Sequence, residues 1–291
     1  MEITASMVKD LRETSGAGMM DCKKALAECN GNMEEAMNYL REKGIAKSAK
    51  KESRIAAEGL ANIFVNGNKA IILEVNSETD FVSKNEEFIN MINVIGESLL
   101  KSNAKTLEEA NEVSTGNETI AEFIIEKIAK IGEKLSLRRF ESVEKNDDEF
   151  FGSYLHMGKI AALTVVKGAS EEVAKDVSMQ AAAMKPLYLN ESEVPESVIE
   201  NERKVQKELA MNEGKPAEIA EKMVDGRIKK FLKDICLVDQ AFIKDGDLSV
   251  EKYVANNGGE VIKMVRYEVG EGMEKRNDNF AEEVMNQIGN N

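Results

Sequence analysis

Tryptophan is absent from the 291-residue chain, and aromatic residues make up only 5% of it. Proteins that bind single-stranded nucleic acid stack the bases on aromatic side chains. This scarcity argues against a stacking platform, and the formal net charge of −14 repels phosphate backbones and anionic membranes. We therefore expect no direct contact with nucleic acid or membrane, and partners that are proteins with basic or mixed surfaces.

Cysteine and histidine are scarce as well. The cysteines Cys22, Cys29 and Cys236 are odd in number and form no CxxC pair, which argues against a disulfide framework and a structural zinc site. The single histidine, His156, has no cysteine or serine motif beside it. A lone histidine is more often structural or part of an interface than a catalytic base, so we do not expect catalysis at His156.

Sequence motifs that would indicate nucleotide binding, metal binding, a membrane span or a signal peptide are absent too. The sequence contains no GxxxxGK[ST] loop, no GxGxxG and no DxDxDG, so we expect the chain to bind no nucleotide, metal or other cofactor itself. No apolar run approaches the ~18 residues that a membrane span needs. The first residues, MEITASMVKDLRE, lack the basic start and apolar core of a signal peptide. We expect a cytoplasmic, reduced protein.

The N-terminal pattern predicts three short helices over residues 3–43. Asn32 and Glu35 predict a capped start for the third helix, and Gly44 is expected to close the module. The stretch that follows Leu40, REKGIAKSAKKESR, is locally basic. We expect it to be a solvated linker.

Two adjacent methionines, Met19 and Met20, begin the second of these helices. Neighbouring residues of a helix cannot both face one core. We therefore expect one of them to be exposed. Two interpretations remain open: a tolerated surface methionine, or an adaptable apolar contact surface, for which flexible, polarizable methionine is suited.

The middle of the chain predicts strands followed by helices. Strands at 60–65 and 69–75 are joined by Asn66-Gly67-Asn68, a hairpin signal. An amphipathic helix at 84–101 follows, and a helix at 118–130 precedes a strand at 135–143. The apolar stripe of the first helix consists of Phe88, Ile92, Ile95 and Leu99.

A similar pattern occurs twice. KAIILEV at 69–75 corresponds to KIAALTV at 159–165, and each is followed by a turn and a helix, the second at about 170–184. Residues 195–235 predict two antiparallel helices with narrow apolar stripes, interrupted at Gly214-Lys215-Pro216. Later segments predict strands near 241–244 and 261–269 and a final helix, FAEEVMNQI. The fold class is α+β.

The turn between the strand 69–75 and its helix contains the letters TDFV and supports two interpretations. If the helix starts at Asp80, its first residues are capped by the preceding oxygens, and Phe81 faces the core together with Phe88. If the helix starts at Ser83, Ser83 and Glu86 form a capping box, and Phe81 lies on an exposed turn. The pattern alone does not choose between them.

Long blocks of the sequence resemble the bacterial elongation factor Ts family over nearly the whole chain. The blocks are VKDLRETSGAGMMDCKKAL, ILEVNSETDFVSKN, AKIGE at 129–133, GKPAEIAEKMVDGRIKKF and YEVGEGMEK. The resemblance implies an N-terminal three-helix UBA-like (ubiquitin-associated-like) domain, a core of two related α/β subdomains, an inserted antiparallel coiled-coil hairpin and a C-terminal helical module. The corresponding boundaries are 1–54 for the first domain with its basic linker, 55–145 for subdomain N, 146–195 with 236–272 for subdomain C, 196–235 for the hairpin, and 273–291 for the C-terminal module.

The function that the resemblance implies is guanine-nucleotide exchange, not bond-making catalysis. A member binds elongation factor Tu in its GDP-bound and nucleotide-free forms, displaces magnesium and accelerates GDP release, so that GTP can bind during translation elongation. The motif implied in magnesium displacement corresponds to Thr79, Asp80, Phe81 and Val82, with Phe81 as an apolar wedge. Secondary contacts with Tu correspond to Leu11, Met19, Met20, Ile131, Gly132 and His156.

One position departs from the family pattern, because Met157 stands between His156 and Gly158. Two other classes of function were weighed. A module that recognises ubiquitin-like folds would explain residues 3–43 but not the TDFV block, and a hydrolase with paired carboxylates lacks a positioned base or metal loop. Whether the protein pairs through its core or forms a one-to-one complex with Tu stays open.

Overall fold

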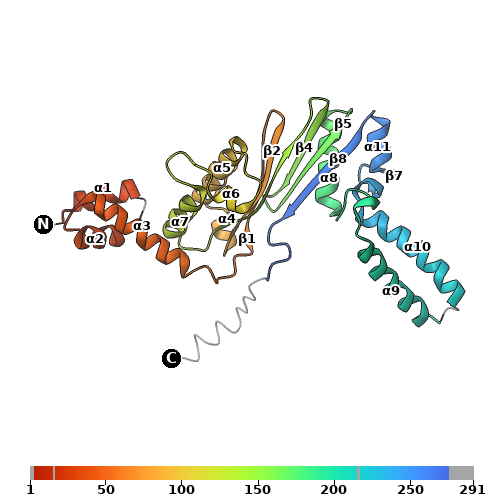
Figure 1. Ribbon diagram of the computed structural model, residues 1–291, viewed down its shortest axis with the longest axis horizontal. Helices are drawn as coiled ribbons and strands as arrows, with labels where there is room; N and C mark the ends of the chain where they lie inside the picture. The colour runs from red at the N-terminus through yellow and green to blue at the C-terminus, as the bar shows by residue number, and fades with distance from the viewer. Residues whose placement is uncertain (1–2, 16, 215–216, 275–291) are drawn as a thin grey trace. The chain divides into compact units, whose positions relative to one another are not determined.

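The computed structural model describes residues 3–15, 17–214 and 217–274 (Figure 1). Where the structure describes them, residues 1–64, 73–142 and 268–291 form one compact unit, and residues 65–72 and 143–267 form a second. The chain therefore enters the second unit twice, first with residues 65–72 and then with residues 143–267, and it returns to the first unit each time. The architecture is mixed α+β, with N-terminal helices followed by antiparallel sheets that are covered by helices.

The N-terminal segment forms the expected helices, α1 (Ala5–Ser15), α2 (Met19–Glu28) and α3 (Met33–Ala49). Their apolar faces share one small core that includes Leu11, Cys22 and Leu26. Asn32 caps α3, since its side chain accepts hydrogen bonds from two backbone N–H groups of the first turn. The predicted helices and the predicted cap are both confirmed.

The expected end of this module at Gly44 is wrong. Helix α3 continues through Gly44 to Ala49, so much of the basic stretch after Leu40 is helical rather than a linker. Gly44 is buried, and a methyl group in its place would lie 3.5 Å from the Cβ of Ala129. This distance is an ordinary van der Waals contact, so the packing of α3 on α7 does not itself require glycine, but this tertiary contact outweighs the low helix propensity of glycine.

The first sheet has the order β1 (Glu58–Asn66), β2 (Lys69–Ser77), β3 (Ser136–Glu144). The central strand β2 is buried from Ala70 to Ser77, as its nearly continuous apolar sequence predicts. The connection between β2 and β3 contains the helices α4 (Asp80–Ser83), α5 (Glu86–Lys101), α6 (Leu107–Asn111) and α7 (Ile120–Ile131). The predicted stripe of α5 is buried at all four positions, Phe88, Ile92, Ile95 and Leu99.

A buried charge lies within this sheet. Glu74 on β2 is fully buried, and its carboxylate accepts hydrogen bonds from Arg138 (2.9 Å), Arg139 (2.6 Å), Asn76 (3.0 Å) and the backbone N–H of Gly270 (2.8 Å). Burial by itself raises the pKa of Glu74, but these bonds and the charge of Arg139 outweigh it, so the pKa lies below its ordinary value. The segment after β8 is thereby attached to the first unit.

The second sheet has the order β4 (Glu149–His156), β5 (Ile160–Lys167), β8 (Glu260–Glu268). Strands β4 and β5 are antiparallel, with His156 opposite Ile160. Helix α8 (Glu171–Met184) packs on β4 and β5. The approach is close at Gly152, where a Cβ atom would lie 1.9 Å from the carbonyl oxygen of Ala174.

Two longer helices, α9 (Glu196–Asn212) and α10 (Ala217–Ile235), pack against each other in the second unit. Apolar residues near Val224 and Ile228 form their contact, and Arg203 pairs with Asp225 at 2.6 Å. The second unit is completed by the 3-10 turns η1 (Glu191–Glu193) and η2 (Leu237–Asp239), the short sheet of β6 (Ala241–Phe242) and β7 (Asp245–Ser249), and helix α11 (Val250–Asn256). The predicted final helix, FAEEVMNQI, lies outside the described residues.

Candidate functional site

The segment after β2 forms a short helix of its own, which we call the TDFV turn (residues 79–82). Thr79 is the N-cap of α4, and its Oγ1 accepts a hydrogen bond from Val82 N at 3.4 Å. Helix α4 ends at Ser83, and Asn85 then caps α5 by accepting from Glu87 N at 2.8 Å. Two capped helices therefore stand where the sequence predicts one.

This break decides the orientation of Phe81. The helix begins at Asp80, as in the first interpretation, but Phe81 is 80% exposed, as in the second. Because α4 and α5 are separate helices, Phe81 does not continue the buried stripe of Phe88. The capping box of Ser83 and Glu86 is not formed; Ser83 is buried and its Oγ donates to the carbonyl oxygen of Asp80 at 2.7 Å.

Asp80, the charged residue of the turn, forms an ion pair at the surface. The carboxylate of Asp80 pairs with Lys84 at 2.7 Å, and both side chains are largely exposed. Exposed pairs of this kind contribute about 0–1 kcal/mol. Val82 is half-buried. The turn thus presents an exposed aromatic ring and a partly exposed carboxylate side by side.

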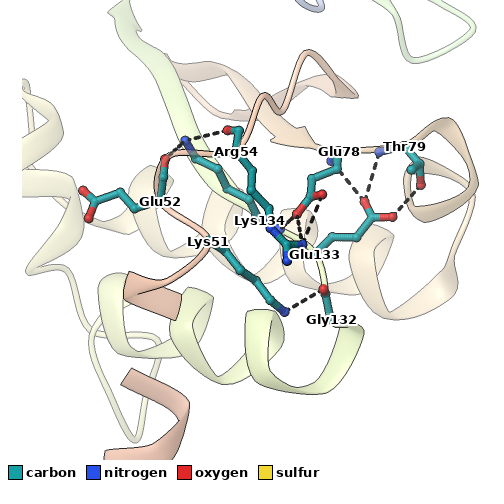
Figure 2. Close-up of polar contacts among 8 residues, drawn as sticks. All are labelled: Lys51, Glu52, Arg54, Glu78, Thr79, Gly132, Glu133 and Lys134. Carbon is teal, nitrogen blue, oxygen red and sulfur yellow. Dashed lines mark hydrogen bonds and ion pairs between the residues drawn. The ribbon is translucent and has the colours of Figure 1, made fainter. Parts of the chain in front are cut away.

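A carboxylate from a distant loop fixes the start of the turn (Figure 2). One oxygen of Glu133 accepts hydrogen bonds from the backbone N–H groups of Glu78 and Thr79, both at 3.0 Å. The other oxygen accepts from the hydroxyl of Thr79 at 2.6 Å. Glu133 belongs to the AKIGE segment, so the structure brings this block and the TDFV turn together.

The interaction is reciprocal. The side chain of Glu78 accepts from the backbone N–H of Lys134 at 2.6 Å and from the guanidinium of Arg54 at 3.2 Å. Each of two neighbouring loops therefore sends a carboxylate to the backbone of the other, and Arg54 supplies positive charge between them. Figure 2 shows these bonds together with that of Lys51, which donates to the carbonyl oxygen of Gly132 at 2.6 Å. The basic stretch after α3 thus contacts both loops.

The predicted residues Ile131 and Gly132 lie at the end of α7. Gly132 is the C-cap, with a left-handed φ of 91° that glycine adopts without strain. One residue earlier in the helix, Lys130 donates to Glu87 on α5 at 2.6 Å. This hydrogen bond holds the pKa of Glu87 below its ordinary value, and it ties the end of α7 to the start of α5.

The predicted contact residues of the N-terminal helices differ in their exposure to solvent. Met19 and Met20 are 58% and 75% exposed, so both methionines are on the surface where the sequence predicts one. Leu11 is fully buried in the core of α1, α2 and α3. It can support a contact surface only from beneath.

His156 belongs to the second unit, at the exposed end of β4. The residue after it, Met157, is 85% exposed and has a left-handed φ of 51°. Together with Gly158 it forms the tight turn into β5, closed by a hydrogen bond from Lys159 N to His156 O at 2.9 Å. The inserted methionine thus lies at the tip of the hairpin, beside the histidine.

Two other kinds of site were sought. In the residues that the structure describes, no group of three or more His, Cys, Asp or Glu side chains is arranged to hold a metal ion. Among the helices of the described ranges, none combines the length and apolar composition that crossing a bilayer requires.

A comparison with protein families gives the context of these residues. The family described as elongation factor TS matches residues 78–271, more than half of the chain. The chain belongs to the elongation factor Ts family. It is therefore a nucleotide exchange factor for elongation factor Tu and not an enzyme that makes or breaks bonds, and its role in translation places it in the cytoplasm. The matched range starts at the TDFV turn and includes AKIGE and His156, whereas Met19 and Met20 precede it.

Sequence reasoning missed the polar contacts that hold the turn: Glu133, Glu78 and Arg54. Glu133 lies within the AKIGE block, in which the predicted contacts are its neighbours Ile131 and Gly132. One local signal was present, because the N3 position of α4 is Val82, whose side chain has no acceptor for the N–H group of the N-cap residue.

Proposed function

We propose that the TDFV turn is the part of this exchange factor that dislodges magnesium from elongation factor Tu. The observation that carries the proposal is the 80% exposure of Phe81 on a turn whose backbone is held by capping and by Glu133. A large apolar ring that faces water on an ordered turn is suited to a partner's pocket.

The energetics of exchange set the task of this turn. GDP is held by a phosphate cradle and by magnesium that neutralises its charge. A factor that binds nucleotide-free Tu more tightly than Tu·GDP must weaken nucleotide binding by the same factor, because coupling between two ligands is reciprocal. The turn need not touch GDP; it needs contacts that are stronger once magnesium has left.

The two exposed side chains suit this task in different ways. Insertion of Phe81 into an apolar pocket contributes about 2–3 kcal/mol and separates the elements that line the pocket. Asp80 has a partly exposed carboxylate, and its exposed ion pair with Lys84 is of the kind that contributes little, so the carboxylate can engage groups near the magnesium site. Thr79 and Val82 hold the geometry of the turn from its two ends.

Secondary contacts complete the proposed surface. Met19 and Met20 offer an adaptable apolar contact, and Leu11 belongs to the core of the three helices that carry them. Ile131 and Gly132 adjoin the loop that holds the turn. His156 in the second unit, next to the exposed Met157, is a further contact.

The finer architecture is part of the same proposal. Helices α1, α2 and α3 form a UBA-like domain, the two sheets with their helices form related subdomains, and α9 with α10 forms an inserted antiparallel coiled coil. The proposed boundaries are those given above: 1–54, 55–145, 146–195 with 236–272, 196–235 and 273–291. The equivalent arrangement of β2–α5 and β5–α8 supports the relation between the subdomains.

Stopped-flow release of fluorescent GDP from elongation factor Tu tests the proposal. Phe81→Ala is expected to slow release about thirtyfold, since about 2 kcal/mol of contact energy is lost. Leu107→Ala is the matched control, because it truncates a partly exposed apolar side chain of the same unit on α6. A Phe81→Ala protein that is folded and exchanges at the wild-type rate contradicts the proposal.

A further inference from the structure

We infer that Glu133 is a positioning residue for exchange: it supplies from a distance the carboxylate that a capping box would supply locally, and it thereby orients the TDFV turn. The inference rests on the proposed function of that turn. It assigns to Glu133 a role that is exerted through Thr79, to which both oxygens of its carboxylate are bonded.

The comparison with neighbouring helices identifies the role. Helices α6 and α7 both begin with a complete capping box, in which a threonine N-cap pairs with a glutamate at N3. In each box the N3 carboxylate accepts the N–H group of the N-cap residue, as Glu122 does for Thr119 at 3.1 Å. The same chain therefore uses threonine and glutamate together to start a helix.

Helix α4 has the threonine but not the glutamate. Its N3 residue is Val82, which has no acceptor for the N–H group of Thr79. Glu133, which lies 54 residues further along the chain, accepts this N–H group at 3.0 Å. Since the carboxylate comes from the AKIGE loop, the N3 position is free to carry an apolar side chain beside Phe81.

The bonds also form a relay through Thr79. Its hydroxyl donates to Glu133 at 2.6 Å and accepts from Val82 N at 3.4 Å. A hydroxyl has one proton, so donation to Glu133 turns its lone pairs toward Val82 N. Glu133 therefore fixes both the rotamer of Thr79 and the first turn of α4, from which Phe81 projects.

Loss of Glu133 should leave the fold and loosen the turn. The Thr79 cap and the buried Ser83 remain, but Phe81 then samples more orientations, and the inserted state is reached less often from an encounter complex that other contacts have formed. The maximum rate of GDP release should fall, while the concentration of exchange factor that gives half this rate changes little. A merely destabilised protein shows the opposite, because unfolding lowers the active concentration.

The test measures GDP release from Tu over a range of concentrations for Glu133→Ala, Glu133→Gln and Glu109→Ala. We expect Glu133→Ala to lower the maximum rate about tenfold and Glu133→Gln to lie between it and wild type, because the amide oxygen still accepts from backbone N–H groups. Glu109→Ala removes the same bond from the capping box of α6. It should leave the maximum rate unchanged.

A double-mutant cycle with Phe81→Ala separates the possible failures. If Glu133 acts by orienting Phe81, the two effects are not additive, and Glu133→Ala adds little once the ring is gone. Additive effects, or a normal maximum rate in Glu133→Ala beside a slow Phe81→Ala protein, overturn the inference and leave the proposed function intact. A normal rate in Phe81→Ala overturns the proposed function itself. Should Glu133→Ala fail to fold, Glu133→Gln carries the same cycle.

Discussion

The strands β2 and β5 are central in their sheets and have similar sequences, yet they differ at several buried positions, one of which is charged in β2 only. Glu74 on β2 corresponds to Thr164 on β5, and both side chains are completely buried. Thr164 is satisfied by one bond to the carbonyl oxygen of Ala174 at 2.9 Å. Glu74 is charged and takes two arginines and a backbone N–H group. The same position of the pattern therefore has two roles. In β5, Thr164 bonds helix α8, whereas in β2, Glu74 pairs with two arginines and binds the segment that contains Gly270.

The turns after these strands differ in a second way. After β5, Gly168 and Ala169 lead directly to Ser170, which caps the long helix α8 by accepting from Val173 N at 3.3 Å. After β2, the chain inserts α4 and needs a second cap at Asn85 before its long helix begins. A single cap is sufficient to start a helix. The extra turn is therefore not needed to start the long helix, and its exposed ring is available for the binding role that we propose.

The largest effect is expected from a variant that lacks the three side chains of this extra turn after Thr79 but keeps its helix. Replacement of Asp80, Phe81 and Val82 by alanine retains the Thr79 cap and introduces the best helix former. Release of GDP from Tu should slow about a hundredfold, which corresponds to ~3 kcal/mol of lost contact energy. As the counterpart, Glu171→Ala with Glu172→Ala in the first turn of α8 should leave release unchanged. Equal rates for the two variants would remove the distinction between the turns.

The next effect concerns the buried position. Glu74→Gln should lower the free energy of unfolding by about 3 kcal/mol at pH 7, because the arginines lose their ionic partner. The folded pKa of Glu74 is depressed, so its contribution is present above the unfolded pKa and is lost as pH falls through the folded pKa. Denaturant unfolding between pH 7 and 3 should therefore show an acid-dependent loss in wild type that is smaller in Glu74→Gln. Thr164→Val should cost ~1 kcal/mol without a change in pH dependence.

The smallest effects are expected from removal of the N-caps of α4 and α8, Thr79 and Ser170. Thr79→Ala and Ser170→Ala each remove one N-cap bond and should each cost about 1 kcal/mol in thermal or denaturant unfolding. We expect Thr79→Ala also to slow GDP release, because the relay to Glu133 is broken, whereas Ser170→Ala exchanges normally. Slow exchange in both variants would mean that stability, rather than the orientation of the turn, limits the activity.

The sequence predicts much of the fold because burial follows periodicity. The stripe of α5 and the run of β2 are local patterns, and both are confirmed. The start of α4 could not be chosen, since Thr79, Ser83 and Asn85 can each cap a helix; the choice depends on the burial of Ser83 and on Glu133, which is distant in sequence. The predicted end of the third helix at Gly44 is wrong for a similar reason, because the packing of Gly44 against Ala129 of α7 cannot be read from the neighbouring sequence.

The hydrogen bond between Gly270 and the buried Glu74 also has a consequence for biosynthesis. Its N–H donor, Gly270, is made 196 residues later, and at about 5–20 residues per second the ribosome needs about 10–40 s to cover that distance. The arginines of β3 emerge earlier and neutralise the charge, but the hydrogen bond from Gly270 to Glu74 can form only after residue 270 has been translated. This factor, which serves peptide elongation, thus completes its own first unit only after residues 143–267 of its second unit have been made.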